Sequence, residues 1–166
     1  MNNVRYEHEL YQPMCEWLRT YLNDKYSRQN CEIFVVDCHS VNLDSVLIAH
    51  DVIHDYPQAV GLQIEIDVLG IVKWDSKSEI VFIEAKKTRL NLHDLGQLWA
   101  YCKLCDPAEA FLLSSAGVGS LEKVLVNLKR EDMLDYGSGK KIKKMKVGKW
   151  DVARNNVDHH SLVPKL

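Results

Sequence analysis

The sequence predicts an α/β fold with a mixed central β-sheet flanked by helices. Three observations predict it: an amphipathic helical pattern over about 4–24, two long β-type runs at about 62–74 and 79–86, and a second helix followed by an apolar run at 110–113. Helical spacing is recognised by apolar residues at intervals of three and four, and strands by short runs rich in β-branched residues. The order helix, strand, hairpin, helix, strand suits a sheet covered by helices.

The first helix is predicted by apolar residues that recur at three- and four-residue intervals. They are Leu10, Met14, Trp17, Leu18, Tyr21 and Leu22. Pro13 interrupts the pattern, so either the helix bends there or it begins after a short first turn. A short strand is expected next at Ile33–Val36.

The secondary structure of the middle of the chain is predicted clearly in some parts and poorly in others. Between Ser40 and Ala59 the pattern is irregular, and Val46–Ala49 fits either a strand or part of a loop. The two long β runs follow, and the residues between them, Asp75–Ser78, have turn chemistry. We therefore expect these runs to form a hairpin.

The second half of the chain alternates helices and strands. Asn91 fits the N-cap of a helix that runs to about Cys105 and ends at Asp106-Pro107. Ala110–Leu113 is a buried-strand candidate, and Leu121–Leu128 has helical spacing. The tail around 141–147 is expected to be strand-rich.

Length and composition indicate one ordinary globular domain. The chain has 166 residues, 46% of them hydrophobic and 27% charged, so we expect a single domain over 1–166 with its core at about 4–128 and a lysine-rich strand extension at about 129–166. The net charge is −2, so the chain has no overall positive field of the kind that attracts nucleic acid. No apolar run reaches membrane-spanning length and no signal peptide is recognisable, which predicts no membrane partner. The five cysteines are expected to be reduced thiols of a cytoplasmic protein.

The tripeptide Glu84-Ala85-Lys86 carries the strongest chemical indication. It ends an apolar run, and Asp67 lies in the preceding apolar run. Alternate strand residues face the same side, so Glu84 and Lys86 should point together. Two carboxylates supply the hard oxygen ligands that Mg²⁺ or Mn²⁺ prefers, and an ammonium beside them can orient a water molecule. The ordinary alternative is an edge strand that runs into the basic loop Lys86–Arg89, because Glu-x-Lys is common by chance.

These residues resemble the PD-(D/E)xK superfamily of restriction-endonuclease-like nucleases, whose pattern is an acidic residue on one strand and (D/E)-x-K on the next. Asp67, Glu84 and Lys86 match that pattern, although Ile66 replaces the proline that usually precedes the aspartate. The resemblance implies a restriction-endonuclease-like core with the order αβββαβ. It covers about the first two thirds of the chain.

Two flanking motifs extend the resemblance. Glu7-His8-Glu9-Leu10 is similar to the E-x-E-L stretch on the first helix of Holliday-junction-resolvase-like members, with Glu7 as the matching position and Glu9 as the fallback. Gln97 to Tyr101 is similar to the Q-x-x-x-Y motif of RecB-like members. Residues at i and i+4 share a helical face, so Gln97 could bond a phosphate or the lysine while Tyr101 braces it. The alternative is a half-buried helix with a tyrosine in the core.

The resemblance implies an Mg²⁺- or Mn²⁺-dependent nuclease that hydrolyses phosphodiester bonds in DNA, as an endonuclease. Asp67, Glu84, Glu7 and the carbonyl of Ala85 would hold the metal, and Lys86 would position the attacking water. A homodimer would place two active sites on two strands. The first alternative is a catalytically inactive nucleic-acid-binding or regulatory domain that keeps the fold. The second is an unrelated α/β domain in which the motifs are accidental.

Two further groups have both a functional and an ordinary interpretation. Cys102 and Cys105 form a C-x-x-C that could join Cys31 and Cys38 in a zinc site, but on a helix it lacks the usual knuckle turn, so core packing is favoured. The run Lys140–Lys149 holds six lysines in ten residues, which suits either a phosphate-contacting strip or a solvated strand edge. The residues expected to contact nucleic acid are Lys87, Arg89, Lys141, Lys143, Lys144 and Lys146. The seven histidines show no metal-ligand period and receive no role.

Overall fold

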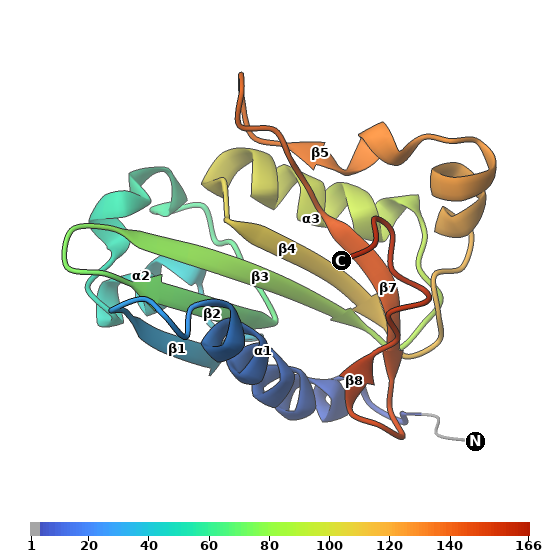
Figure 1. The fold of residues 1–166 in the computed structure, drawn as a ribbon, viewed down its shortest axis with the longest axis horizontal. Coiled ribbons are helices and arrows are strands. Elements are labelled where there is room, and N and C mark those ends of the chain that lie inside the picture. Colours follow the sequence, from blue (N-terminus) through green and yellow to red (C-terminus); the bar gives the residue numbers. More distant parts are fainter. Residues whose placement is uncertain (1–3) are drawn as a thin grey trace.

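The structure, a computed structural model, describes residues 4–166. These residues form a six-stranded mixed sheet with the strand order β1-β2-β3-β4-β7-β8 (Figure 1). Its strands are β1 (Glu32–Asp37), β2 (Val68–Lys73), β3 (Ser78–Lys86), β4 (Glu109–Ser114), β7 (Lys146–Asp151) and β8 (Asn156–Val157). Two further short strands, β5 (Asp135–Tyr136) and β6 (Lys143–Lys144), pair with each other. The helices are α1 (Tyr11–Lys25), α2 (Leu43–Ala49) and α3 (Leu92–Cys105), with 3-10 turns at Glu7–Leu10, Ile53–Asp55, Pro57–Ala59 and Glu131–Leu134 and a π-helical turn at Lys123–Asn127.

The sheet is parallel in its middle and antiparallel at both sides. β1, β2 and β3 are antiparallel neighbours, β3, β4 and β7 run parallel, and β8 is antiparallel to β7. Asp37 of β1 pairs with Val68 of β2, which pairs in turn with Ile83 of β3, and Lys86 lies opposite Ser114. The end of β1, the start of β2 and the end of β3 therefore meet at one edge of the sheet.

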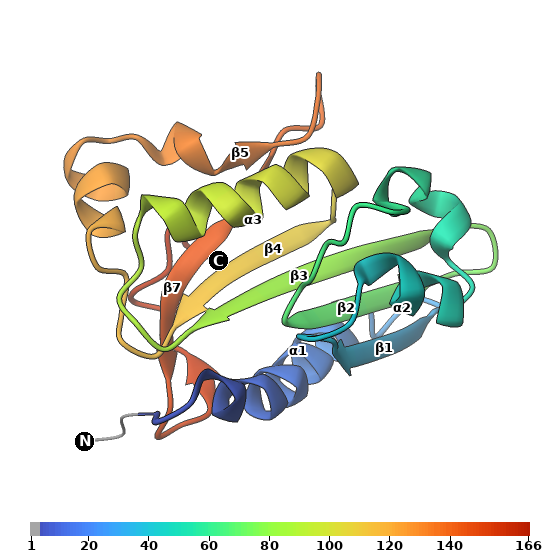
Figure 2. The same cartoon turned by 180° about the vertical axis from the view of Figure 1, so that it is seen from behind.

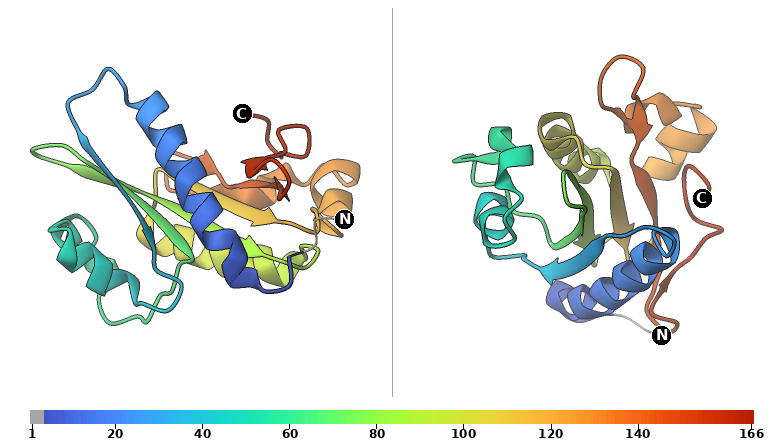
Figure 3. Two further views of the ribbon diagram at one scale, coloured as in Figure 1. Left: turned by 90° about the horizontal axis from the view of Figure 1, so that it is seen from below. Right: turned by 60° about the vertical axis from the view of Figure 1, so that its left-hand side comes forward.

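Helices cover both faces of the sheet. α1 packs on one face, and α2 and α3 pack on the other (Figures 2 and 3). The α1 contact is close at Gly70, where a Cβ atom would lie 2.9 Å from Cδ1 of Leu22. The predicted arrangement of a mixed sheet flanked by helices is confirmed. None of the helices formed by residues 4–166 has both the length and the apolar character needed to cross a membrane.

The first helix begins after a short turn. The 3-10 turn Glu7–Leu10 precedes α1, so Pro13 lies in the first turn of the α-helix. Backbone N–H groups in a first helical turn have no partner within the helix, and proline is therefore tolerated there. Of the two alternatives for Pro13, the late helix start is the one observed.

Two sequence predictions in the middle of the chain were wrong. Val46–Ala49 is neither a strand nor a loop but part of α2, because Leu43, Val46 and Leu47 have helical spacing and are buried together. The long run at 62–74 is a strand only from Val68 onward. Its first part hydrogen-bonds elsewhere: the amide of Leu43 donates to the carbonyl of Ile64, and the amide of Cys38 donates to that of Asp67.

The hairpin and the second helix formed as predicted. β2 and β3 are antiparallel, with Lys73 opposite Ser78 across the turn. Asn91 caps α3, because its side chain accepts a hydrogen bond from the Asp94 amide, and the left-handed Asp106 ends the helix. The run at 121–128 forms the π-helical turn in place of a regular α-helix.

The C-terminal strand β7 is tied to the first helix through one buried carboxylate. Glu109, at the start of β4, accepts from Lys146 Nζ and Lys25 Nζ, each at 2.8 Å, and from the Tyr21 hydroxyl at 2.7 Å. Burial by itself would raise the pKa of Glu109, but the bonds to these donors outweigh it and the pKa is lowered. This group, which we call the Glu109 network, joins α1, β4 and β7.

The cysteines are packing residues. Cys102 and Cys105 are fully buried in the core beneath α3, and both are free thiols, as are Cys15, Cys31 and Cys38. Burial raises the pKa of the Cys105 thiol to about 11. The burial of both side chains in the core supports the packing interpretation of the C-x-x-C.

Candidate active site

Asp67 and Glu84 meet at the sheet edge where β2 begins and β3 ends. Asp67 directly precedes β2, and its Oδ2 accepts a hydrogen bond of 2.8 Å from the Ala85 amide. Only 9% of Asp67 and 6% of Glu84 are exposed. The two carboxyl groups are close enough for the charge of Asp67 to raise the pKa of Glu84. The structure therefore brings together the two acids that the sequence pairs.

The paired carboxyl groups cannot both be ionised at low cost. Burial, and then the charge of Asp67, raise the pKa of Glu84 to about 8. Burial also raises the pKa of Asp67, although the Ala85 N–H opposes that shift. Among the described residues, no donor reaches the buried Oε2 of Glu84. Two facing carboxyls with an unpartnered oxygen need either a proton or a cation, so the donor set fits a hard metal ion.

Lys86 extends over the carboxyl pair. Its Nζ lies 3.6 Å from Oε1 of Glu84, which confirms that the two side chains point together. Burial alone would lower the pKa of Lys86, but the negative charges of Glu84, Glu7 and Asp94 outweigh it, and the pKa is raised. The side chain of Lys86 is 20% exposed, so it is not sealed off from solvent.

Glu7 lies at the same edge, and its carboxylate is bonded to a backbone amide. Its Oε2 accepts from the Lys87 amide at 3.3 Å, and its charge raises the pKa of both Asp67 and Glu84. Glu9, the fallback, instead accepts from the Tyr6 amide at 2.6 Å and caps the 3-10 turn. Within residues 4–166, no group of three or more His, Cys, Asp and Glu side chains is gathered closely enough to hold a metal ion. Glu7 thus adds charge to the pair without completing a three-carboxylate cluster.

The carbonyl oxygen of Ala85 is a third oxygen donor beside the two carboxyl groups. The N–H and C=O of one strand residue point to the same neighbouring strand. Because the Ala85 amide points to Asp67, its carbonyl faces the same side. The oxygen donors at this edge are therefore Asp67, Glu84 and the Ala85 carbonyl.

Gln97 and Tyr101 are not joined to the acids. Gln97 is exposed, and Tyr101 is half-buried against the core beneath α3. Over residues 4–166 no hydrogen bond connects either of them to Asp67, Glu84 or Lys86. The placement matches the alternative of a half-buried helix with a tyrosine packed on the core.

Two residues that sequence reasoning missed do approach the site. Asp94, one turn before Gln97 on α3, is buried and accepts a hydrogen bond from the Asn91 amide. Its negative charge raises the pKa of Lys86. Burial, together with the nearby Asp67 carboxylate, raises the pKa of the Tyr11 phenol. Signals for both exist: Asn91-x-x-Asp94 is a capping box, and Tyr11 stands four residues after Glu7.

A histidine stands at the rim of the site. His39 Nδ1 lies 2.6 Å from Oδ1 of Asp37, and its ring stacks on Tyr11 with centroids 4.7 Å apart. Asp37 ends β1 opposite Val68, so this pair belongs to the same sheet edge. Sequence spacing alone had assigned His39 no role, since the Asp37 and Tyr11 contacts arise only from the fold.

The residues expected to contact nucleic acid fall into two groups. Lys87 and Arg89 are exposed beside the site, immediately after β3. The others come from the lysine-rich run near the start of β4, at the opposite end of the sheet. Of these, Lys141 is exposed, and three are in ion pairs: Lys143 with Asp106 at 2.7 Å, Lys144 with Asp135 at 2.5 Å, and Lys146 with Glu109 at 2.8 Å.

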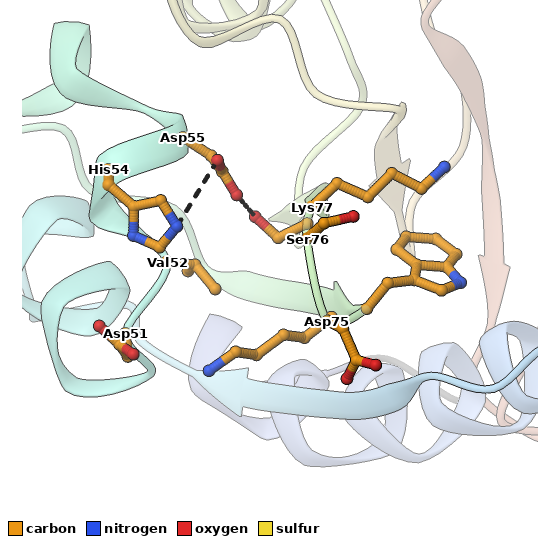
Figure 4. A pocket seen from close by; sticks show the side chains of 10 residues that line it. Asp51, Val52, His54, Asp55, Asp75, Ser76 and Lys77 are labelled. Carbon is orange, nitrogen blue, oxygen red and sulfur yellow. Dashed lines mark hydrogen bonds and ion pairs between the residues drawn. The ribbon is translucent and has the colours of Figure 1, made fainter.

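A separate hollow of about 120 Å³ lies at the other end of the β2–β3 hairpin (Figure 4). There His54 Nε2 lies 3.7 Å from Asp55 Oδ1, and Asp55 accepts a hydrogen bond from Ser78. None of the residues lining it was predicted as a site residue, and it is distinct from the Asp67–Glu84 edge.

Comparison with protein-family models, with curated proteins and with solved structures found no match to this chain. The function is therefore argued from the geometry of the site.

Proposed function

We propose that this protein is a metal-dependent nuclease that hydrolyses phosphodiester bonds in DNA, acting as an endonuclease on a restriction-endonuclease-like core. The observation that carries the proposal is the buried pair Asp67 and Glu84, with an unpartnered Glu84 oxygen and the Lys86 ammonium 3.6 Å from its other oxygen. The element order α1, β1, β2, β3, α3, β4 supports the finer fold assignment, with α2 inserted after β1.

Asp67, Glu84 and the Ala85 carbonyl would hold Mg²⁺ or Mn²⁺, with Glu7 contributing through a water molecule. When bound there, such an ion supplies a water of lowered pKa and offsets the negative charge that develops on a phosphate. The protein's own part is preorganisation. The Ala85 amide fixes the Asp67 carboxyl, so this ligand is oriented before substrate arrives.

Lys86 has the role of positioning the attacking water and of stabilising the transition state. The carboxylates of Glu84, Glu7 and Asp94 keep its ammonium charged. In hydrolysis the water oxygen forms a bond to phosphorus while the bond to the leaving oxygen breaks, and negative charge accumulates on the non-bridging oxygens. A fixed ammonium at hydrogen-bonding distance from those oxygens lowers the barrier.

The rival function is a nucleic-acid-binding or regulatory domain that keeps the fold without catalysis. The carboxyl pair weighs against it, because burying two facing acids destabilises the fold and binding a polyanion does not require them. Titration calorimetry with Mg²⁺ at pH 8 separates the two. We expect wild type to bind the ion and Glu84→Gln to bind it at least about tenfold more weakly, since a neutral amide is a poorer ligand. A wild type that takes up no divalent ion favours the rival.

Cleavage is tested with supercoiled plasmid and labelled oligonucleotides in Mg²⁺ or Mn²⁺. We expect Asp67→Asn, Glu84→Gln and Lys86→Ala each to lose about 100-fold or more of the activity, because each removes a group that acts on the reacting phosphate. Glu16→Gln, an exposed carboxylate change on α1, is the matched control and should cut like wild type. Absence of metal-dependent cleavage by wild type, or equal cleavage by Lys86→Ala, would rule out the proposal.

A further inference from the structure

A line of connected hollows starts beside Lys86. The first, of about 330 Å³, is lined by Val4, Lys87, Thr88, Ser115 and Ala116. Lys87 and Thr88 directly follow the lysine of the site along the chain. The hollow therefore lies next to the end of β3, which carries Glu84 and Lys86.

Two more hollows continue from the first. The second, of about 490 Å³, shares Ala116 with it and adds Arg89. The third, of about 410 Å³, shares Gly117 with the second and reaches Lys149. Because neighbouring hollows share lining residues, they follow one another along the carboxyl ends of the parallel strands β3, β4 and β7, which lie together in Figure 1. We call this row of hollows the carboxyl-edge furrow.

The loops that wall the furrow are held by backbone contacts. The Ser115 amide donates to the Lys86 carbonyl at 3.0 Å, and the Leu90 amide donates to the Gly117 carbonyl at 3.2 Å. Gly119 has φ +60°, and a Cβ atom there would lie 2.5 Å from the Leu90 carbonyl oxygen. The turn after β4 is thus packed against the loop after β3, and the furrow has a defined shape.

The positively charged side chains of the furrow have no ion-pair partner in the described part of the chain. Within residues 4–166, Lys87, Arg89 and Lys149 take part in no ion pair, and Arg89 and Lys149 are exposed. Glu122 is the acid that lines the second and third hollows. Three other lysines near the end of the chain, Lys143, Lys144 and Lys146, are each paired with an acid. The furrow therefore carries three cations that are available to a negatively charged ligand.

We infer that the carboxyl-edge furrow binds the sugar–phosphate backbone of one DNA strand and leads it to Lys86. This rests on the proposed nuclease function and names how its substrate is held. Successive phosphates of a single strand form a line of negative charges, which matches a line of hollows carrying Lys87, Arg89 and Lys149. The hydroxyls of Thr88 and Ser115 add neutral donors of the kind that contact phosphate oxygens.

Binding is measured by fluorescence anisotropy with a short labelled single-stranded DNA in EDTA, where no metal-dependent cleavage occurs. We expect Arg89→Ala and Lys149→Ala each to weaken binding by roughly three- to tenfold at low salt. Each should also reduce the slope of log K against log salt by about 0.7, the value for one phosphate contact on a single strand. The variant that carries both substitutions should show the sum of the two losses in binding free energy and of the two reductions in slope.

Lys77→Ala is the matched control, because it removes the same charge from an exposed lysine in the turn of the β2–β3 hairpin, at the other end of the hairpin from Lys86. Its affinity should stay within about twofold of wild type, since a lysine that contacts no phosphate adds little to binding. A loss as large as that of Lys149→Ala, or a double variant that binds like wild type, overturns the inference. Thermal melting checks that Arg89→Ala and Lys149→Ala are folded, and both side chains are exposed.

The result can be separated from that of the cleavage assay. If wild type cuts DNA but the furrow variants bind it normally, the furrow inference fails and the nuclease proposal remains. If the variants lose binding but wild type cuts nothing, the furrow inference stands and the catalytic proposal fails.

Discussion

At the scale of single residues, Glu84 links the site to the stability of the fold. Its pKa is raised from 4.5 to about 8 by burial and by Asp67. The unfolded chain therefore loses this proton near pH 4.5, whereas the folded chain keeps it until about pH 8. Between these values the folded state binds more protons than the unfolded state, so the contribution of Glu84 to stability falls as pH rises.

We expect the free energy of unfolding of wild type in EDTA to fall between about pH 5 and pH 8 by up to about 1.4 kcal/mol per pH unit relative to Glu84→Gln. Glutamine cannot ionise, so the variant lacks this component of the slope. Urea denaturation at stepped pH measures the difference. Parallel curves for the two proteins would contradict the assignment of the raised pKa. Added Mg²⁺ should stabilise wild type more at pH 8 than at pH 5, because the ion and the proton compete for the same oxygens.

Part of the site could be predicted from individual residues. Strand alternation places Glu84 and Lys86 on one side, and the hairpin brings Asp67 to them. Asp94 and Tyr11 could not be placed this way, because their contacts depend on where α3 and α1 pack. The expected role of Gln97 stays a prediction, since helical spacing gives a shared face but not the distance of that face from the acids.

At the scale of secondary-structure elements, the Glu109 network fixes α1 and β7 against β4. Glu109→Gln should lower the free energy of unfolding by about 3 kcal/mol, because it leaves Lys146, a lysine with 16% of its side chain exposed, without a counter-charge. Chemical denaturation measures the loss. Asp132→Asn, which breaks the exposed pair with Arg130, is the control and should leave the denaturation midpoint unchanged. Equal effects of the two variants would show that the network is not a stabilising contact.

Elements with their own local signals were predicted well. The hairpin has turn residues between two apolar runs, and α3 has a capping residue at its start. The errors lie where tertiary bonding decides the conformation. Residues 64–67 have a strand-like composition, but their carbonyls accept from Cys38 and Leu43 instead of a ladder. In α2 the segment is too short for its period to be distinguished from that of a strand.

At the scale of the whole molecule, the placement of charge matters more than its total. The chain carries a net charge of −2, yet Lys87, Arg89 and Lys149 line the carboxyl-edge furrow without an ion-pair partner among residues 4–166. Lys143, Lys144 and Lys146 are instead each paired with an acid. A count of lysines along the sequence cannot distinguish these cases, because the acids that pair with Lys143 and Lys144 lie 37 and 9 positions away.

The homodimer expected from the sequence remains a prediction at this scale. A 19.1 kDa chain with one site needs a second copy to cut both strands in a single binding event. Light scattering should give a mass about twice that of the chain, and plasmid assays should yield linear product early in the reaction. A monomer that only nicks plasmid would contradict the dimer.

The position of β7 in the sheet has a consequence for how the protein is made. β4 has six buried residues, and the strand that covers its outer edge comes from residues 146–151. During synthesis β4 leaves the ribosome well before β7, so for that interval it presents an open, apolar edge to other chains. That edge closes only once residues 146–151 have been made, because β3 covers just the other edge of β4.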